Sequence, residues 1–226
     1  MKKKMIKHFR LQLLLSLTFI SFLTFAQHAE KENKWEKDIV KFEKADTQNP
    51  PEPGKILFIG SSSITIWKDI QEYFPDKGVI NRGFGGSQTS DLLNYKERLI
   101  LPYKPSQVVI YVGENDIAAN KTPKKAATDG KNLIKWILKQ FPDASVAYIS
   151  MKPSIRRWEM RENMQAANEL MQKFASKKEQ VAFIDVWDSM LGDEGKPLAN
   201  IFLDDGLHMN SNGYAIWKKE IAPYLK

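Results

Sequence analysis

The chain has 226 residues, of which 42% are hydrophobic and 27% are charged, and its formal net charge is +7. This length is enough for one well-buried α/β domain, and the composition excludes a wholly disordered chain. The sequence contains no cysteine, which excludes disulfides, thiol nucleophiles, thiolate metal sites and a lipid-modified cysteine.

The first 26 residues have the pattern of a secretory signal peptide. A basic start with five cations precedes an apolar run over residues 11–25, and Ala26 ends a short cleavage site before Gln27. A bilayer-spanning helix needs roughly 20 apolar residues, whereas this run is shorter and contains Ser16, Thr18 and Ser21. We therefore expect a cleaved leader and a secreted or periplasmic protein without stable membrane insertion. An uncleaved anchor is the alternative.

Most of the positive charge belongs to this leader. Removal of its five cations from the total of +7 leaves a formal charge of +2 on the remaining chain. No basic stripe with interleaved aromatic residues is left, so we expect no nucleic-acid partner. The sequence does not indicate an oligomeric state.

Residues 27–54 are predicted to form an N-terminal helix and a stiff connector. The helix is indicated by apolar residues at the spacing of one helical face, which are Trp35, Ile39, Val40 and Phe42. We expect this helix to pack on the back of the domain. Residues 49–54 contain three prolines and cannot be helical.

Strand-like and helix-like segments alternate over residues 55–226, which we take as the main domain. Short apolar runs occur at 55–60, 79–84, 107–113, 145–151 and 181–187. Helical patterns lie between and after them, at 65–74, 88–100, 123–140, 160–178 and 211–225. Nearly continuous apolar strands separated by helices indicate a parallel sheet covered on both faces. We therefore predict an α/β fold, a three-layer α/β/α sandwich with a parallel sheet of about five strands.

Four polar motifs follow predicted strands, where ligands bind in open parallel sheets. Residues 60–63 (Gly-Ser-Ser-Ser) follow the first strand, and residues 81–87, with three glycines, follow the second. Residues 113–116 (Gly-Glu-Asn-Asp) follow the third, and residues 204–208 (Asp-Asp-Gly-Leu-His) come after the fifth. Each motif also has a purely structural interpretation, because serines cap helices, glycines form tight turns and an asparagine can bridge loops.

Histidine is scarce, and this limits the chemistry. His8 lies in the leader and His28 lies two residues past the expected cleavage site, so His208 is the sole histidine of the predicted domain. One histidine without cysteine is a poor basis for a zinc site, and we expect neither a metal nor an organic cofactor. The alternative is a carboxylate-rich calcium site built from Asp193, Glu194, Asp204 and Asp205.

In their order and their placement after strands, these motifs resemble the sequence blocks of the SGNH (GDSL-like) hydrolases, from about Trp35 to the C-terminus. The resemblance implies an SGNH/flavodoxin-like fold for residues 55–226 and a serine esterase without cofactor. It also implies the site residues: a catalytic triad of Ser62, Asp205 and His208, and an oxyanion hole from Ser62, Gly86 and Asn115.

The chemistry of these residues agrees with the resemblance. A serine hydroxyl is a weak nucleophile until a neighbouring base accepts its proton, and His208 can do so through Nε2 if Asp205 holds Nδ1–H. No Gly-x-Ser-x-Gly elbow is present, so an α/β-hydrolase is a poorer match. Ser61 stands where the family commonly has an Asp that is not the nucleophile, and this departure concerns the local loop geometry.

The sequence thus predicts a carboxylic ester hydrolase that acts through an acyl-Ser62 intermediate. The loops beyond the strands have no long apolar insertion and carry charged and aromatic residues, namely Arg82, Asp116, Arg156, Arg157 and Trp158. We assign the last three to the substrate rim, with surface decoration as the alternative. These loops favour a small-molecule or carbohydrate ester with a short, acetyl-like acyl group. The enzyme alternative is a lysophospholipase or thioesterase, and the non-enzyme alternative is a glycan-binding protein on a hydrolase scaffold.

Overall fold

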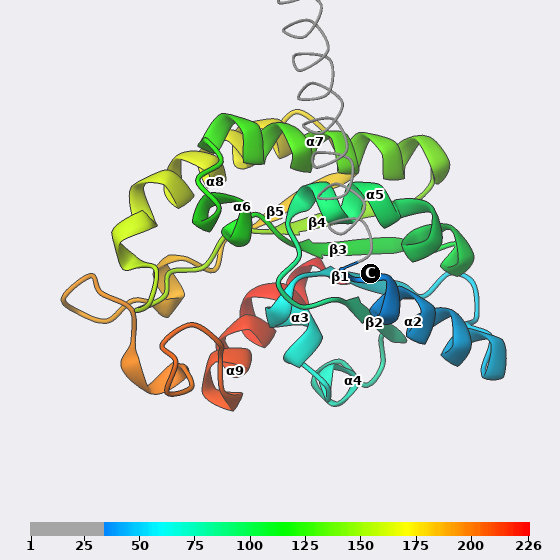
Figure 1. Cartoon of the computed structure of the whole chain (residues 1–226), viewed down its shortest axis with the longest axis horizontal. Coiled ribbons are helices and arrows are strands. Elements are labelled where there is room, and N and C mark those ends of the chain that lie inside the picture. The colour runs from blue at the N-terminus through cyan, green and yellow to red at the C-terminus, as the bar shows by residue number, and fades with distance from the viewer. Residues whose placement is uncertain (1–33) are drawn as a thin grey trace, which may run out of the picture. The chain divides into compact units, whose positions relative to one another are not determined.

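The computed structural model describes residues 34–226 (Figure 1). The predicted signal peptide lies outside the described residues. Residues 42–226 form one compact unit, and its boundary falls inside helix α2 (Glu36–Gln48), the predicted N-terminal helix. Within residues 34–226, no helix combines the length and the apolar composition that a membrane span requires.

The predicted α/β fold with a five-stranded parallel sheet is confirmed. The strands are β1 (Ile56–Gly60), β2 (Val79–Gly83), β3 (Gln107–Tyr111), β4 (Ser145–Ile149) and β5 (Val181–Ile184). They pair in the order β2-β1-β3-β4-β5, and every pair is parallel. From β1 the chain adds β2 on one side of the sheet, and it then crosses to add β3, β4 and β5 on the other side. Ligands bind at such a switch point, here beyond the carboxyl ends of β1 and β3.

Two layers of helices cover the sheet, as Figure 1 shows, with α5, α7 and α8 on one face and α3, α4 and α9 on the other. The first set is α5 (Thr89–Ile100), α7 (Pro123–Gln140) and α8 (Arg161–Ala175). The second set is α3 (Ser62–Ile66), α4 (Ile70–Tyr73) and α9 (Ser211–Ile221). Because both faces are covered, β1, β3 and β4 are buried at every position, which accounts for their continuous apolar sequences.

The helices differ from the prediction most clearly at two places. The helix predicted over 65–74 is the two short helices α3 and α4, and a further short helix, α6 (Glu114–Ala118), lies in the predicted polar loop after β3. Single turns of 3-10 helix complete the chain at Leu101–Tyr103, Trp158–Met160, Asp188–Met190, Ala199–Ile201 and Ala222–Tyr224.

An aromatic cluster under α3 brings distant parts of the sequence together. Trp67, which ends α3, stacks on Tyr214 of α9 with ring centroids 4.7 Å apart and lies edge-on to Trp217 at 6.1 Å. The Tyr214 hydroxyl also donates a hydrogen bond of 2.9 Å to the backbone carbonyl of Ser63. Helix α9 begins three residues after His208, so this packing sets the serine motif beside the histidine motif.

Candidate active site

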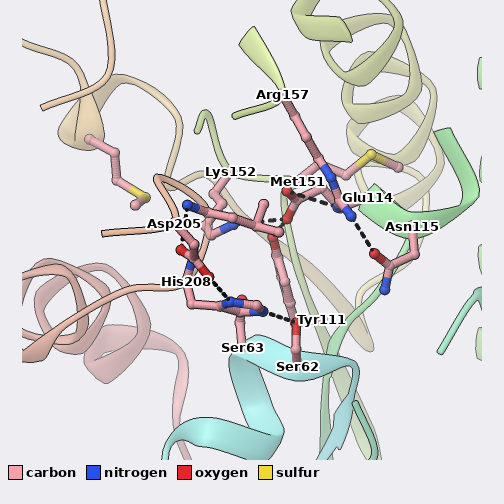
Figure 2. A network of polar contacts seen from close by, with 12 residues as sticks. Ser62, Ser63, Tyr111, Glu114, Asn115, Met151, Lys152, Arg157, Asp205 and His208 are labelled. Atoms are coloured by element: carbon pink, nitrogen blue, oxygen red, sulfur yellow. Dashed lines mark hydrogen bonds and ion pairs between the residues drawn. The ribbon is translucent and has the colours of Figure 1, made fainter. Parts of the chain in front are cut away.

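The structure brings Ser62, His208 and Asp205 into one hydrogen-bonded chain (Figure 2). The Ser62 Oγ lies 3.0 Å from His208 Nε2, and His208 Nδ1 lies 2.5 Å from Asp205 Oδ2. With Nδ1–H donating to the carboxylate, Nε2 is left to accept the serine proton. This is the arrangement that the sequence predicts for the three residues.

Local contacts hold Asp205 in its ionised form and orient it. Its Oδ1 accepts the backbone N–H groups of Leu207 and His208, each at 2.9 Å. Partial burial acts to raise the pKa of Asp205, but these two N–H groups and the imidazole outweigh it and lower the pKa to about 2. Asp205 therefore stays charged at any pH at which the imidazole titrates, as a carboxylate that stabilises an imidazolium must.

The loop that carries His208 is fixed by its own backbone. The Leu203 N–H donates to the His208 carbonyl at 2.8 Å, and the Gly206 N–H donates to Leu203 at 2.9 Å. Gly206 has a φ of +63°, a left-handed conformation that glycine adopts readily. Asn210 then caps α9 by accepting the backbone N–H groups of Asn212 and Gly213. The imidazole is thereby placed by a short turn and not by a long mobile loop.

The three adjacent serines differ in exposure, and this supports the predicted register. Ser61 and Ser63 are buried, with 4% and 2% of their surfaces exposed, whereas Ser62 is half-buried. Gly60 makes this placement possible, because a Cβ there would lie 2.0 Å from the Tyr111 carbonyl oxygen. The close approach of β1 to β3 at Gly60 directs Ser62 toward the carboxyl end of the sheet, where His208 meets it.

Ser87 connects the two other residues predicted for an oxyanion hole to this serine motif. The Ser87 Oγ donates to the Gly60 carbonyl at 3.4 Å, and the Ser87 carbonyl accepts Nδ2–H of Asn115 at 3.0 Å. Gly86, directly before Ser87, has a φ of +74° and no heavy atom within 4 Å of where a Cβ would lie. Gly86 is thus open to a ligand. Ser62 is the first residue of α3, and its N–H has no acceptor within the helix.

Asp116 anchors the glycine segment from behind. It is fully buried, and its Oδ2 accepts both the backbone N–H and the hydroxyl of Thr89, at 2.9 and 3.2 Å. Lys121 Nζ compensates the charge at 2.7 Å from Oδ1. Asp116 therefore connects α6 to the start of α5. The loop with Gly86 directly precedes α5.

A buried charged network lies beside the triad, and the sequence did not predict it (Figure 2). Glu114 Oε2 accepts Lys152 Nζ at 2.9 Å and the Tyr111 hydroxyl at 2.5 Å, and Glu114 Oε1 lies 3.1 Å from Arg157 Nη1. Burial acts to raise the pKa of Glu114, but the Lys152 and Arg157 charges and the Tyr111 hydrogen bond hold it below its ordinary value. Removal of one partner from such a buried pair costs ~3–5 kcal/mol, because it leaves an unpaired charge.

Arg82 and Asp116, two of the charged loop residues from which the sequence favoured a polar substrate, have partners within the protein. Arg82 donates to the carboxylate of Asp46 in α2 and, at 2.6 Å, to the Tyr103 hydroxyl. Asp116 has no exposed surface. Both side chains therefore hold the fold together.

The three residues predicted for the substrate rim have different surroundings. Arg156 is exposed, and its backbone N–H donates to the Gly206 carbonyl at 3.0 Å. Arg157 is engaged by Glu114 and by Asn115, whose Oδ1 accepts Nη2–H at 2.8 Å. Trp158 stacks on Trp187 with ring centroids 6.3 Å apart. The rim assignment stays a prediction for Arg156 and Trp158, and Arg157 has polar partners within the protein.

The carboxylates considered for calcium do not gather into a site. Among residues 34–226, no three His, Asp or Glu side chains are close enough together to hold a metal ion. Asp205 is committed to His208, which leaves the calcium alternative without support from the geometry.

Two solved structures show the same fold. A Streptococcus pneumonia protein described as a platelet activating factor is 25% identical with a TM-score of 0.77, over 92% of this chain and 99% of that chain. An acetylxylan esterase from Geobacillus stearothermophilus is 16% identical with a TM-score of 0.62, over 77% of this chain and 95% of that chain. The second likeness is one of fold alone.

Comparison of sequences gives the family. An N-acylneuraminate cytidylyltransferase of Escherichia coli is 29% identical over 174 residues, which are 76% of this chain but only 40% of that protein. The chain thus spans less than half of that relative, and the transferase name describes the longer protein. The model of the GDSL-like lipase/acylhydrolase family matches residues 62–216, more than half of the chain, and this range includes Ser62, Gly86, Asn115 and His208. The chain therefore belongs to the GDSL-like lipase/acylhydrolase family of hydrolases.

Proposed function

We propose that this hydrolase is a carboxylic ester hydrolase that acts through an acyl-Ser62 intermediate. The observation that carries the proposal is the chain of contacts from Ser62 Oγ through His208 to Asp205, at 3.0 and 2.5 Å. In that geometry Ser62 Oγ attacks the ester carbonyl carbon while His208 Nε2 takes its proton. The imidazolium then gives this proton to the departing alkoxide, so an alcohol leaves and the acyl group stays on Ser62.

The second half of the reaction uses the same groups in reverse. His208 removes a proton from water, the resulting hydroxide attacks the acyl carbon, and Ser62 recovers its proton as the acid departs. In both halves the negative charge that develops on the carbonyl oxygen needs donors. The N–H groups of Ser62 and Gly86 and the amide of Asn115 supply them, and the loss of one such donor typically costs ~3 kcal/mol of barrier stabilisation.

We further propose that the substrate carries a short acyl group, first an acetyl group on a carbohydrate. Two observations support this proposal. The basic, then apolar first 26 residues favour export to the cell exterior or periplasm, where polymeric glycans and their esters are accessible. One structural neighbour is an acetylxylan esterase. Arg156 and Trp158 remain candidates for the rim on which the alcohol part of the ester rests.

A specific observation also favours the longer-chain alternative, a lysophospholipase or thioesterase. Ile155 and Leu203 are each 47% exposed, although they are large aliphatic side chains. Both belong to the segments around the histidine loop, since Leu203 N–H donates to the His208 carbonyl and Gly206 packs against Ile155. Exposed aliphatic groups at that place would suit an apolar chain, so the acyl length has to be measured.

A series of aryl esters distinguishes a preference for short acyl groups from a preference for long ones. Acetate, butyrate, hexanoate and decanoate esters of one phenol would be hydrolysed below their micelle limits, with the Ser62→Ala protein as the background control. Each methylene buried in an acyl groove gains ~0.8 kcal/mol, so a groove would raise kcat/KM several-fold for every two added carbons. We expect kcat/KM to be highest for acetate and to decline by butyrate or hexanoate. A steady rise to decanoate would overturn the acetylesterase proposal and establish the long-chain alternative.

A further inference from the structure

Asn115 has a fixed amide orientation because its two ends have different partners. Its Nδ2 donates to the Ser87 carbonyl at 3.0 Å, and its Oδ1 accepts from Arg157 Nη2 at 2.8 Å. A guanidinium only donates and a backbone carbonyl only accepts, so the oxygen must face Arg157 and the NH₂ group must face Ser87. An NH₂ group has two N–H bonds, and Ser87 takes one of them. The second is free to meet the carbonyl oxygen of an ester.

Arg157 is itself held from the other side. Figure 2 shows its guanidinium between Glu114 and Asn115, with Nη1 lying 3.1 Å from Glu114 Oε1. Glu114 is fixed in turn by Lys152 and the Tyr111 hydroxyl, at 2.9 and 2.5 Å. Burial raises the pKa of Tyr111 well above its ordinary value, so this hydroxyl stays a donor. Arg157 is therefore held beside Asn115 by an ion pair with Glu114, and charge-assisted hydrogen bonds fix the Glu114 carboxylate in turn.

We propose that Arg157 is a positioning residue for the oxyanion hole. It fixes the Asn115 amide so that one N–H is directed at the carbonyl oxygen, and Glu114 fixes Arg157. This inference rests on the proposed esterase function, because it assigns Arg157 to the same reaction. It also replaces the rim assignment, since both terminal nitrogens of Arg157 are engaged within the protein.

The planar fork of arginine is what the two contacts require. Nη1 makes an ion pair with a carboxylate while Nη2 donates a hydrogen bond to an amide oxygen, so one side chain makes both contacts at once. A lysine ammonium retains the charge without this fork. Arg157→Lys therefore separates an effect of charge from an effect of geometry, and Arg157→Gln removes the charge as well.

The test is a double-mutant cycle on kcat, with KM followed in parallel on an aryl acetate. We expect Asn115→Ala to lower kcat by ~100-fold with little change in KM, because its donor acts mainly in the transition state. Arg157→Gln should lower kcat by about 10-fold or more through a misplaced donor, and Arg157→Lys should resemble it. In the Asn115→Ala background, Arg157→Gln should have almost no further effect, because the group it positions is gone.

Arg98→Gln is the matched control. It removes an arginine that also makes two contacts with a glutamate, to Glu43 at 2.7 and 2.8 Å, and it lies on α5 outside the candidate site. Its kcat should equal that of the wild type. Thermal unfolding of every variant checks that the fold is retained.

Two kinetic outcomes would overturn the proposal. An equal loss of kcat from Arg157→Gln in both backgrounds would show that Arg157 acts independently of Asn115. A higher KM with unchanged kcat would make Arg157 a substrate contact. Failure of the esterase function has a different signature, namely no hydrolysis above the Ser62→Ala background.

Side-chain amide NMR then tests positioning alone. The Asn115 NH₂ resonances should shift or broaden in Arg157→Gln, and unchanged resonances would contradict the inference.

Discussion

Ser62→Ala should lower the turnover of an aryl acetate by at least ~1,000-fold, because it removes the atom that forms the covalent intermediate. The contact that Ser62 Oγ makes is to His208 Nε2, so its loss should leave the fold intact. Steady-state kinetics measures the turnover, and thermal unfolding should give a melting temperature close to that of the wild type.

The neighbouring serines provide the matched controls for this prediction. Ser61 and Ser63 are buried, and among residues 34–226 the serine hydroxyl that hydrogen-bonds to His208 Nε2 is that of Ser62, so Ser61→Ala and Ser63→Ala should retain most of the turnover. If either of them abolishes activity while Ser62→Ala does not, the nucleophile is misassigned by one position.

His208→Gln should have the second large effect, on the order of a 1,000-fold loss of kcat/KM, because glutamine cannot accept the serine proton. In the wild type, kcat/KM should fall at acid pH as the imidazole is protonated, and this acidic limb should disappear in the residual activity of the variant. An acidic limb that persists unchanged in His208→Gln would exclude His208 as the base.

The Asp205 carboxylate does not contribute to this acidic limb of kcat/KM. Its folded-state pKa of about 2 is lower than the ordinary value, and a depressed pKa means that ionised Asp205 favours the folded state. That contribution is fully present above the unfolded-state pKa of ~4 and is lost only as the pH falls toward 2. A decline of activity well above pH ~4 therefore belongs to another group than Asp205.

The sequence was most informative where a pattern depends on neighbours along the chain. The run from Val108 to Val112 is apolar at every position, and such a run is typical of a strand buried on both faces, as β3 is. Helix boundaries depend on local competition and were less reliable. The predicted helix over 65–74 is interrupted after Ile66. There the Asn81 side-chain Nδ2–H donates hydrogen bonds to the backbone carbonyls of Ile64 and Trp67, at 2.7 and 3.0 Å.

For the site, the sequence predicted that Ser62, Asp205 and His208 lie together because their motifs follow strands of one parallel sheet, and the structure brings these three side chains into contact. The sequence missed the network around Glu114 because charged residues in predicted loops are usually solvated, and nothing local reveals that Lys152 and Arg157 lie against the same carboxylate. A glutamate between Gly113 and Asn115 and a lysine three residues after the end of β4 were the available signals. The sequence also contained no sign that Arg82 is engaged within the protein, since its partner Asp46 is 36 residues away in the sequence.

The most direct test of the account is covalent labelling of the nucleophile. An alkyl fluorophosphonate reacts with an activated serine, which displaces fluoride and forms a phosphonate ester that water does not readily remove. Peptide mapping by mass spectrometry would locate the adduct, and residual hydrolysis would be followed on the same samples. We predict one adduct, on Ser62, whose formation parallels the loss of activity and which is absent from the Ser62→Ala protein. An adduct on Ser61 or Ser63, or full activity after labelling of Ser62, would contradict the account.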